Sequence, residues 1–140
     1  MDNNLYIDLI NKALQARNNA YAPYSDYLVG AALLTGDDKI YTGCNVENAS
    51  YGATNCAERT AVFKAVSEGS SKIKCIAIVG GERGKDITGY AYPCGVCRQV
   101  LREFSNPDEL EVIVALSTEK YKKYYLSELL PDSFGPDFKS

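Results

Sequence analysis

The segment PCGVCRQ at residues 93–99 constrains the fold more than any other part of the sequence. Cys94 and Cys97 lie three residues apart in it, and at the first turn of a helix this spacing directs both sulfurs toward one point. Pro93 has a fixed φ that suits the start of a helix. The segment therefore predicts a helix over residues 95–104 with two cysteines at its N-terminal end.

A second helix, over residues 56–68, is expected to begin with the segment CAER at 56–59. Alanine and valine at positions 61, 62, 65 and 66 give it an apolar face, and Gly69 suits its C-terminal end. The chain between Cys56 and Cys94 is long enough for this helix, a strand and a loop. A β-α-β-α unit of this kind places the second helix beside the first, so the cysteines are expected to converge.

The flanking segments complete an α/β pattern. Periodicity predicts helices over 4–19 and 126–130, and strands over 27–35, 39–44, 73–79, 110–116 and 121–125. Residues 45–55 and 80–89 are expected as loops, and 131–140 as a tail. Strands that alternate with helices imply a mixed sheet flanked by helices. The length of 140 residues predicts a single domain, 1–140.

Five cysteines and no histidine are the most informative counts in the composition. The lack of histidine excludes Ser-His-Asp and Cys-His nucleophile pairs, histidine proton shuttles and histidine metal ligands. A general acid or base must then be Glu, Asp, Lys, Tyr or Cys, and a transition-metal site must use thiolates and carboxylates. An odd number of cysteines also cannot form a complete disulfide framework.

The charge and hydropathy of the chain limit the kinds of partner it can bind and the cellular compartments in which it is expected. A net charge of −3 argues against binding nucleic acid, which draws on a basic surface. No apolar run approaches the length of about 20 residues that crosses a bilayer, so no membrane association is expected. The first residues lack the basic-then-apolar layout of a signal peptide. A cytoplasmic location is therefore expected, where thiols stay reduced.

Three converging thiolates from Cys56, Cys94 and Cys97 would suit one Zn²⁺ and leave a fourth position open, as catalytic zinc sites do. Glu58 lies two residues after Cys56, close to that open position without being a ligand. In a chain without histidine it is the expected proton carrier. Three thiolates leave an excess negative charge on a divalent ion, which helix N-termini and Arg59 are expected to offset.

Other interpretations of the cysteines stay open at this point. Cys94 and Cys97 could form a redox pair, or belong to a four-cysteine structural zinc site with Cys44 or Cys75 as the fourth ligand. Cys75 lies in an apolar strand and Cys44 ends a strand, so both are expected in the core. A single Cys-x-x-Cys pair is a weak signal, but Cys-x-Glu followed by Pro-Cys-x-x-Cys is a known zinc deaminase signature.

With these residues the sequence resembles the cytidine deaminase family in its small, homotetrameric, three-cysteine form. The resemblance covers almost the whole chain and includes YAPYS at 21–25, VGAAL at 29–33, GCNVEN at 43–48, LLP at 129–131 and FGP at 134–136. It implies an α/β fold, a three-layer α-β-α sandwich around a five-stranded mixed sheet, which agrees with the element order above. It also implies a homotetramer with active sites near subunit interfaces.

The resemblance implies zinc-dependent hydrolytic deamination of cytidine and 2′-deoxycytidine, in pyrimidine salvage. Water activated by the metal attacks C4 of the cytosine ring, and Glu58 moves protons to N3 and to the leaving amine. The products are uridine or 2′-deoxyuridine and ammonia. The expected partner is thus a small nucleoside, and the expected cofactor is Zn²⁺.

Substrate-binding roles also follow from the resemblance. Asn45 and Glu47 match positions that bind the ribose, a task that suits an amide and a carboxylate. Backbone groups of Cys56 and Ala57 are expected to contact the base.

Aromatic residues complete this expected set. Tyr27 and Phe134 match positions that line the base pocket, where the family often has Phe at the position of Tyr27. Tyr51 matches a residue that reaches in from a neighbouring subunit. Arg98 and Gln99 also match the motif and are expected to be mainly structural.

Three alternative functions are compatible with parts of this pattern. A deaminase of an aminoacyl-nucleoside antibiotic such as blasticidin S is the nearest, although Asn45, Glu47 and Phe134 favour the ordinary nucleoside. A deaminase of polynucleotides is the second alternative. Such enzymes usually have histidine at the first ligand position and need a basic groove, whereas this chain has Cys56 and a net charge of −3. A non-catalytic, zinc-stabilised binding domain would need a fourth protein ligand.

Overall fold

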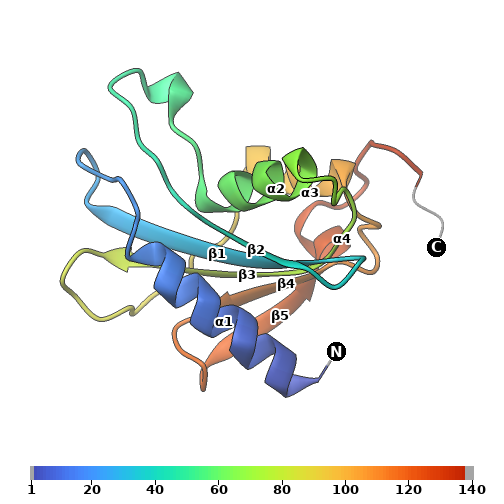
Figure 1. The fold of residues 1–140 in the computed structure, drawn as a ribbon, viewed down its shortest axis with the longest axis horizontal. Coiled ribbons are helices and arrows are strands. Elements are labelled where there is room, and N and C mark those ends of the chain that lie inside the picture. Colours follow the sequence, from blue (N-terminus) through green and yellow to red (C-terminus); the bar gives the residue numbers. More distant parts are fainter. Residues whose placement is uncertain (1, 138–140) are drawn as a thin grey trace.

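The fold is an α/β structure in which helices flank one sheet (Figure 1). The computed structural model describes residues 2–137, and within them no helix has the length and apolarity to cross a membrane. The elements are, in chain order, α1 (Asn3–Arg17), β1 (Tyr27–Thr35), β2 (Ile40–Cys44), the 3₁₀ turn η1 (Tyr51–Ala53), α2 (Ala57–Ser67), β3 (Ile73–Glu82), α3 (Gly95–Glu103), β4 (Glu111–Ala115), β5 (Tyr121–Tyr125) and α4 (Leu126–Leu129).

The five strands form one mixed sheet in the order β2-β1-β3-β4-β5. β3 and β4 are parallel, whereas the other neighbouring pairs are antiparallel. A parallel pair needs a crossover, which α3 supplies here. Because α2 leads into β3 and α3 follows it, both helices begin near the carboxyl end of β3. This topology brings Cys56 and Cys94 together.

The helices form two layers around the sheet. α1 covers one face, and α2 and α3 cover the other (Figure 1). Buried residues form one cluster on each face, with Leu9 and Ile10 of α1 in the first and Val62 of α2 and Leu101 of α3 in the second. The expected three-layer sandwich around a five-stranded mixed sheet is therefore confirmed.

Cys44 and Cys75, the two cysteines that are not expected as metal ligands, differ in burial because they lie in different strands. Ile76 and Ile78 pack on the face covered by α2 and α3, whereas Cys75 and Ala77 pack on the α1 face, as the alternation of a strand requires. Cys75 is thus a core residue, as expected. The same expectation is wrong for Cys44, which is only half-buried because it ends β2, an edge strand.

Some boundaries differ from those expected. Cys56 precedes α2 as its N-cap residue and is not the first helical residue, whereas α3 begins at Gly95 after its N-cap Cys94, as expected. β3 continues to Glu82, into the expected 80–89 loop, because Glu82 pairs with Tyr27 at the start of β1. The turn η1 interrupts the expected loop over 45–55. Tertiary pairing accounts for the longer strand, since the residues after position 79 are not themselves strongly apolar.

Gly43 allows α2 to lie close against β2. A Cβ at this position would lie 2.5 Å from the backbone nitrogen of Ala61 and 2.6 Å from the backbone oxygen of Ala57. Both atoms belong to the helix backbone, which cannot yield unless the whole helix shifts. We expect Gly43→Ala to lower the free energy of unfolding by about 1–3 kcal/mol, as overpacking does, measured by urea denaturation at fixed protein and zinc concentrations.

Gly89→Ala is the matched control for this variant, because a Cβ at Gly89 meets nothing within 4 Å. We expect it to unfold at the urea concentration of the unmodified protein or slightly above it. Equal unfolding curves for the Gly43 and Gly89 variants would show that α2 and β2 are not in such close contact.

Candidate metal and catalytic site

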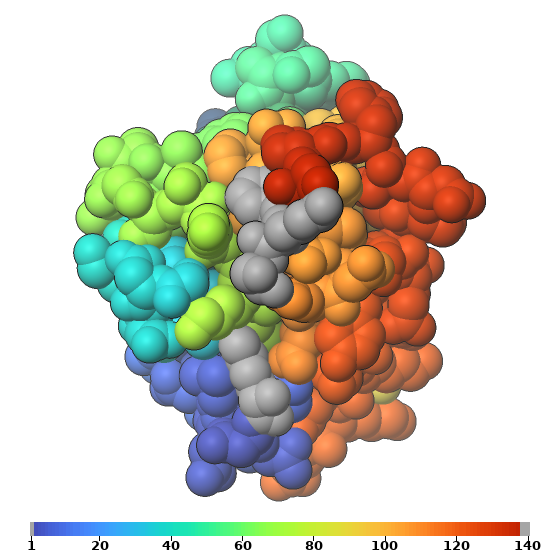
Figure 2. All heavy atoms as spheres, turned by 90° about the vertical axis from the view of Figure 1, so that its right-hand side faces the viewer, coloured from blue at the N-terminus to red at the C-terminus, as the bar shows by residue number. Residues whose placement is uncertain are grey.

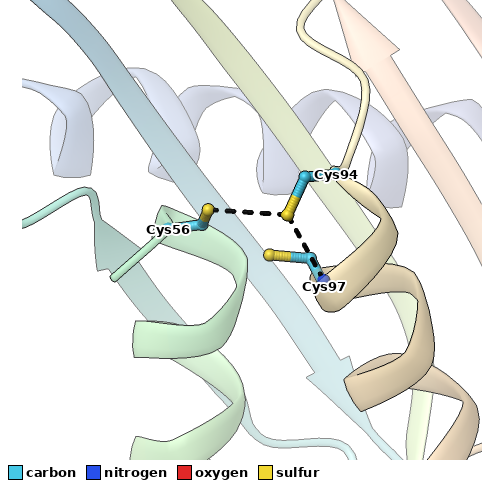
Figure 3. A group of neighbouring side chains, drawn as sticks. All are labelled: Cys56, Cys94 and Cys97. Atoms are coloured by element: carbon cyan, nitrogen blue, oxygen red, sulfur yellow. Dashed lines mark hydrogen bonds between the residues drawn. The ribbon is translucent and has the colours of Figure 1, made fainter. Parts of the chain in front are cut away.

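Three cysteine side chains converge where α2 and α3 begin (Figure 3). The Sγ atoms of Cys56, Cys94 and Cys97 all lie within 4.8 Å of one another, and those of Cys56 and Cys94 are 3.7 Å apart. Cys56 and Cys94 cap the two helices, and Cys97 lies in the first turn of α3. The structure therefore brings these residues together as the sequence predicts.

The arrangement fits a tetrahedral zinc ion. At a Zn–S distance of about 2.3 Å, two sulfurs on a tetrahedron lie about 3.8 Å apart, close to the separation between Cys56 and Cys94. Among residues 2–137 the metal-binding group consists of Cys56, Cys94 and Cys97, without Cys44 or Cys75. This donor set argues against the closed four-cysteine site, and a zinc ion held by it would keep a fourth position for water.

The three thiols change one another's acidity. The hydrogen bond from Cys97, together with that from Arg59, lowers the pKa of Cys56 to about 5. The hydrogen bond to Cys56 raises the pKa of Cys97, and burial raises it further. One thiolate therefore forms readily in this cluster. A metal ion held here would displace the remaining protons, since only deprotonated thiols are ligands.

Arg59 brings positive charge to the sulfurs. Its Nη2 donates to Cys56 Sγ at 3.3 Å. Its Nε is buried and has no hydrogen-bond partner among the described residues, an arrangement that is costly unless negative charge lies nearby. The guanidinium and the two helix N-termini therefore bring positive charge to the place where three thiolates on a divalent ion would leave an excess of negative charge.

Glu58 lies in the first turn of α2 with only 4% of its surface exposed. Burial raises its pKa to about 7, and the nearby charge of Cys56 also acts to raise it. A carboxyl group with a pKa near neutrality can both accept and donate a proton, as general acid–base catalysis requires. Glu58 is therefore suited to move protons beside the cysteine cluster.

A cavity of about 340 Å³ opens next to the cysteines, and this volume is in the range of small-molecule sites. Much of the expected site borders it. The lining combines the expected Tyr27, Asn45, Cys56, Ala57, Glu58 and Cys94 with Val29, Thr54, Asn55, Ile78, Tyr90, Ala91 and Tyr92.

Tyr90 and Tyr92 are cavity residues that the sequence reasoning did not single out. Their ring centroids lie 6.4 Å apart, and the ring of Tyr92 meets that of Tyr124 edge-on at 5.8 Å. The hydroxyls of Tyr92 and Tyr124 are 3.1 Å apart, which ties this wall of the cavity to β5. The signal in the sequence is their place in the segment YAYPC at 90–94, which leads into Cys94.

Asn45 is held by the backbone of β1. Its Oδ1 accepts a hydrogen bond from the Val29 nitrogen at 2.9 Å, and its Nδ2 donates to the Tyr27 oxygen at 2.9 Å. The residue is 9% exposed and also borders the cavity. The amide therefore orients the start of β1, including Tyr27, from a position beside the cysteines.

Glu47 and Tyr51 line a neighbouring cavity and not the one beside the cysteines. Glu47 Oε1 accepts hydrogen bonds from the backbone nitrogens of Tyr24 at 2.9 Å and Ser25 at 3.1 Å, and its Oε2 accepts one from Ser25 Oγ. The hydrogen bond from the Ser25 hydroxyl lowers the pKa of Glu47. Thr54 borders both cavities, so the two lie side by side.

Phe134 lies on the surface with 81% of its area exposed, and Tyr51 is 77% exposed. Neither ring lines the cavity beside the cysteines within a single chain. The Phe134 carbonyl accepts a hydrogen bond from Gln99 Nε2 at 3.1 Å, which holds this part of the C-terminal segment on α3. The structure thus leaves Phe134 apart from the other expected site residues and places Tyr51 with Glu47 at the neighbouring cavity.

The chain is similar to known proteins over most of its length. Residues 4–114 match the family described as the cytidine and deoxycytidylate deaminase zinc-binding region, a range that contains Glu58 and all three clustered cysteines. A cytidine deaminase of Sporosarcina psychrophila is 45% identical over 129 residues, which are 92% of this chain and 90% of that protein. One of Halalkalibacterium halodurans is 48% identical over 126 residues, covering 90% and 91%.

Solved structures show the same likeness in three dimensions. The crystal structure of cytidine deaminase from Burkholderia pseudomallei matches with a TM-score of 0.81 at 47% identity, covering 91% of this chain and 97% of that one. That from Mycobacterium tuberculosis matches with a TM-score of 0.78 at 41% identity, covering 94% and 98%. The likeness therefore extends over nearly the full length of both chains.

Proposed function

This chain belongs to the cytidine and deoxycytidylate deaminase family, and we propose on that premise that it is a zinc-dependent cytidine deaminase. It converts cytidine and 2′-deoxycytidine to uridine and 2′-deoxyuridine with release of ammonia. The observation that carries this proposal is Glu58, a buried carboxyl with a pKa raised to about 7 beside three clustered thiols. The site thereby combines a place for a metal with a proton carrier.

The residues of the chain account for the proton transfers of this reaction. Zinc held by Cys56, Cys94 and Cys97 supplies Lewis-acid activation of water near neutral pH. The Glu58 carboxylate accepts one proton from the water and delivers it to N3 of the cytosine ring. It then passes the second proton to the exocyclic amine, which leaves as ammonia. The oxygen stays on C4, so one water is consumed for each ammonia released.

The substrate-binding roles rest on the chemistry of the residues around the cavity. The backbone of Cys56 and Ala57 borders it and would contact the base, with the Tyr27 ring beside it. Asn45 and Glu47 would bind the ribose, since an amide and a carboxylate suit sugar hydroxyls. The ribose-binding role of Glu47 is supported by its cavity, which adjoins the cavity beside the cysteines and shares Thr54 with it.

We also infer a homotetramer with active sites near subunit interfaces. Tyr51 and Phe134 are large aromatic residues with 77% and 81% of their areas exposed, and they would complete the site of a neighbouring subunit. Residues 1–140 would act as one catalytic domain in each subunit. Pyrimidine salvage in the cytoplasm is the setting that suits a nucleoside deaminase with reduced thiols.

A deaminase assay on cytidine, with a zinc measurement on the same sample, tests the proposed function. We expect about one zinc ion per chain, because the cluster offers one site. Loss of the cytidine ultraviolet absorbance should match the ammonia released. Zinc-loaded protein without turnover of cytidine or 2′-deoxycytidine would contradict the proposed enzyme.

Blasticidin S in a parallel assay separates the nearest alternative. We expect faster turnover of cytidine, because Asn45 and Glu47 have the chemistry for a free ribose. Turnover confined to blasticidin S would identify the chain as a deaminase of the antibiotic.

A further inference from the structure

The turn before α3 positions one of the three clustered cysteines. Pro93 is buried, and Cys94 follows it in an extended conformation as the N-cap of α3. The Cys94 carbonyl accepts the first helical hydrogen bond, from the Arg98 nitrogen at 2.9 Å. The Pro93 carbonyl lies outside the helix and has no helical donor. Arg98 Nε donates to it at 2.7 Å, so a single residue binds two consecutive carbonyls of the turn.

The same guanidinium reaches a distant part of the chain. Arg98 Nη1 donates to the carbonyl of Leu129, the last residue of α4, at 2.7 Å. Carbonyls at the end of a helix lack helical partners, so this contact also satisfies an acceptor of α4. The planar fork of arginine can hold two acceptors in fixed directions, whereas the lysine ammonium is a single point on a flexible stem. Arg98 therefore links the Pro93–Cys94 turn rigidly to α4.

The position of the Cys94 sulfur depends on this turn. Cys97 is buried and Cys56 is half-buried, whereas Cys94 is exposed, so packing holds Cys94 least. Its Sγ accepts a hydrogen bond from the Cys97 nitrogen at 3.4 Å, a contact that exists only while the turn keeps its shape (Figure 3).

We propose that Arg98 is a positioning residue for the metal site: by bridging the Pro93 and Leu129 carbonyls, it holds Cys94 in place as a ligand and slows the loss of zinc. The inference rests on the proposed zinc site and extends it to a residue that does not touch the metal. Mutation of a side chain that orients a metal ligand commonly lowers metal affinity by about 10–100-fold.

Gln99 and Arg102 of α3 make similar hydrogen bonds to the C-terminal segment, and these bonds do not involve the Pro93–Cys94 turn. Arg102 donates to Ser133 Oγ at 3.0 Å and to the Pro136 carbonyl at 2.7 Å, and Gln99 donates to the Phe134 carbonyl. Figure 2 shows this C-terminal segment, in red, beside the orange residues of the α3 region. Arg102 thus resembles Arg98 in type and in contacts, but it holds only the C-terminal segment.

Zinc release from Arg98→Lys and Arg102→Lys tests the proposal. Each zinc-loaded protein is mixed with excess colorimetric chelator, and the release rate is followed while circular dichroism monitors the fold. We expect Arg98→Lys to release zinc about 10–100-fold faster than the unmodified protein. Arg102→Lys should release it at the unmodified rate, since its contacts do not reach the turn.

Two results would overturn the proposal. One is release from Arg98→Lys at the unmodified rate, and the other is equal acceleration by both variants, which would indicate general loosening of α3. If Arg98→Lys does not fold, Arg98→Gln, which keeps one donor group, must show the same acceleration. Substitution of Co²⁺ adds a spectroscopic test, because its thiolate absorption should change in the Arg98 variants and not in Arg102→Lys.

The outcomes also separate this inference from the proposed function. Unmodified protein that turns over cytidine, together with slow release from Arg98→Lys, would refute only the role of Arg98. Zinc-loaded protein that fails to turn over cytidine, together with fast release from Arg98→Lys, would refute only the proposed reaction.

Discussion

Replacing Glu58 by glutamine is expected to lower kcat on cytidine by about 10²–10⁴-fold, the range that a positioned general acid–base group contributes. Glutamine keeps the shape of the side chain but can neither accept the proton of the attacking water nor deliver it to the base. Zinc content should stay at the unmodified level, because Glu58 is not one of the clustered thiols. The measurements are steady-state kinetics and zinc content of the same preparation.

The stability of Glu58→Gln should not fall with its activity. Burial raises the pKa of Glu58, so the site disfavours the charged form that catalysis uses. A neutral amide removes that cost, and we expect unfolding at the same or a higher urea concentration. Glu68→Gln is the matched control, since Glu68 is exposed at the other end of α2. This variant should change neither kcat nor the urea concentration at which the protein unfolds. Normal turnover by Glu58→Gln would exclude Glu58 as the proton carrier.

Cys97→Ser should abolish zinc binding and reduce cytidine turnover to background. Cys97 is a fully buried member of the cluster, and a serine hydroxyl is a much poorer zinc ligand than a thiolate. Because zinc stabilises only the folded chain, its loss should also lower Tm. A chelator should then lower the Tm of the unmodified protein to near that of the variant and leave the variant unchanged. Metal analysis and thermal unfolding with and without chelator measure these effects.

Cys75→Ser provides the matched control for this variant. Cys75 is as fully buried as Cys97, but it packs on the α1 face of the sheet, away from the cluster. Its serine variant should lose about 1–3 kcal/mol of stability from a buried hydroxyl without a good partner. It should keep its zinc and its kcat. Full zinc content in Cys97→Ser, or zinc loss in Cys75→Ser, would overturn the assignment of the three ligands.

Much of the metal site could be predicted from the sequence because its key spacings are local. Cys94 and Cys97 share one helical turn, so backbone geometry alone directs their sulfurs together. Glu58 follows Cys56 by two residues, and the absence of histidine leaves carboxylates and thiols for the chemistry. The fold class was predictable for a similar reason, since apolar periodicity distinguishes helices from strands over a few residues.

Some predictions failed where burial or pairing depends on distant segments. Cys44 and Cys75 both lie in strands, but β2 is at the edge of the sheet and β3 at its centre, so only Cys75 is in the core. The extension of β3 to Glu82 needed its partner Tyr27 in β1. Neither outcome is a property of the residues adjacent to the position in question.

The sequence by itself determined the fold class, the two helix starts and the residue types that can bind a metal. Only the tertiary structure decided that Glu58 is buried with a raised pKa, that Cys44 is half-buried, and that Arg98 reaches Leu129. The reason is physical. Spacing within a helical turn follows from backbone geometry, whereas burial, acidity and long-range hydrogen bonds depend on which distant segments the sheet topology brings together.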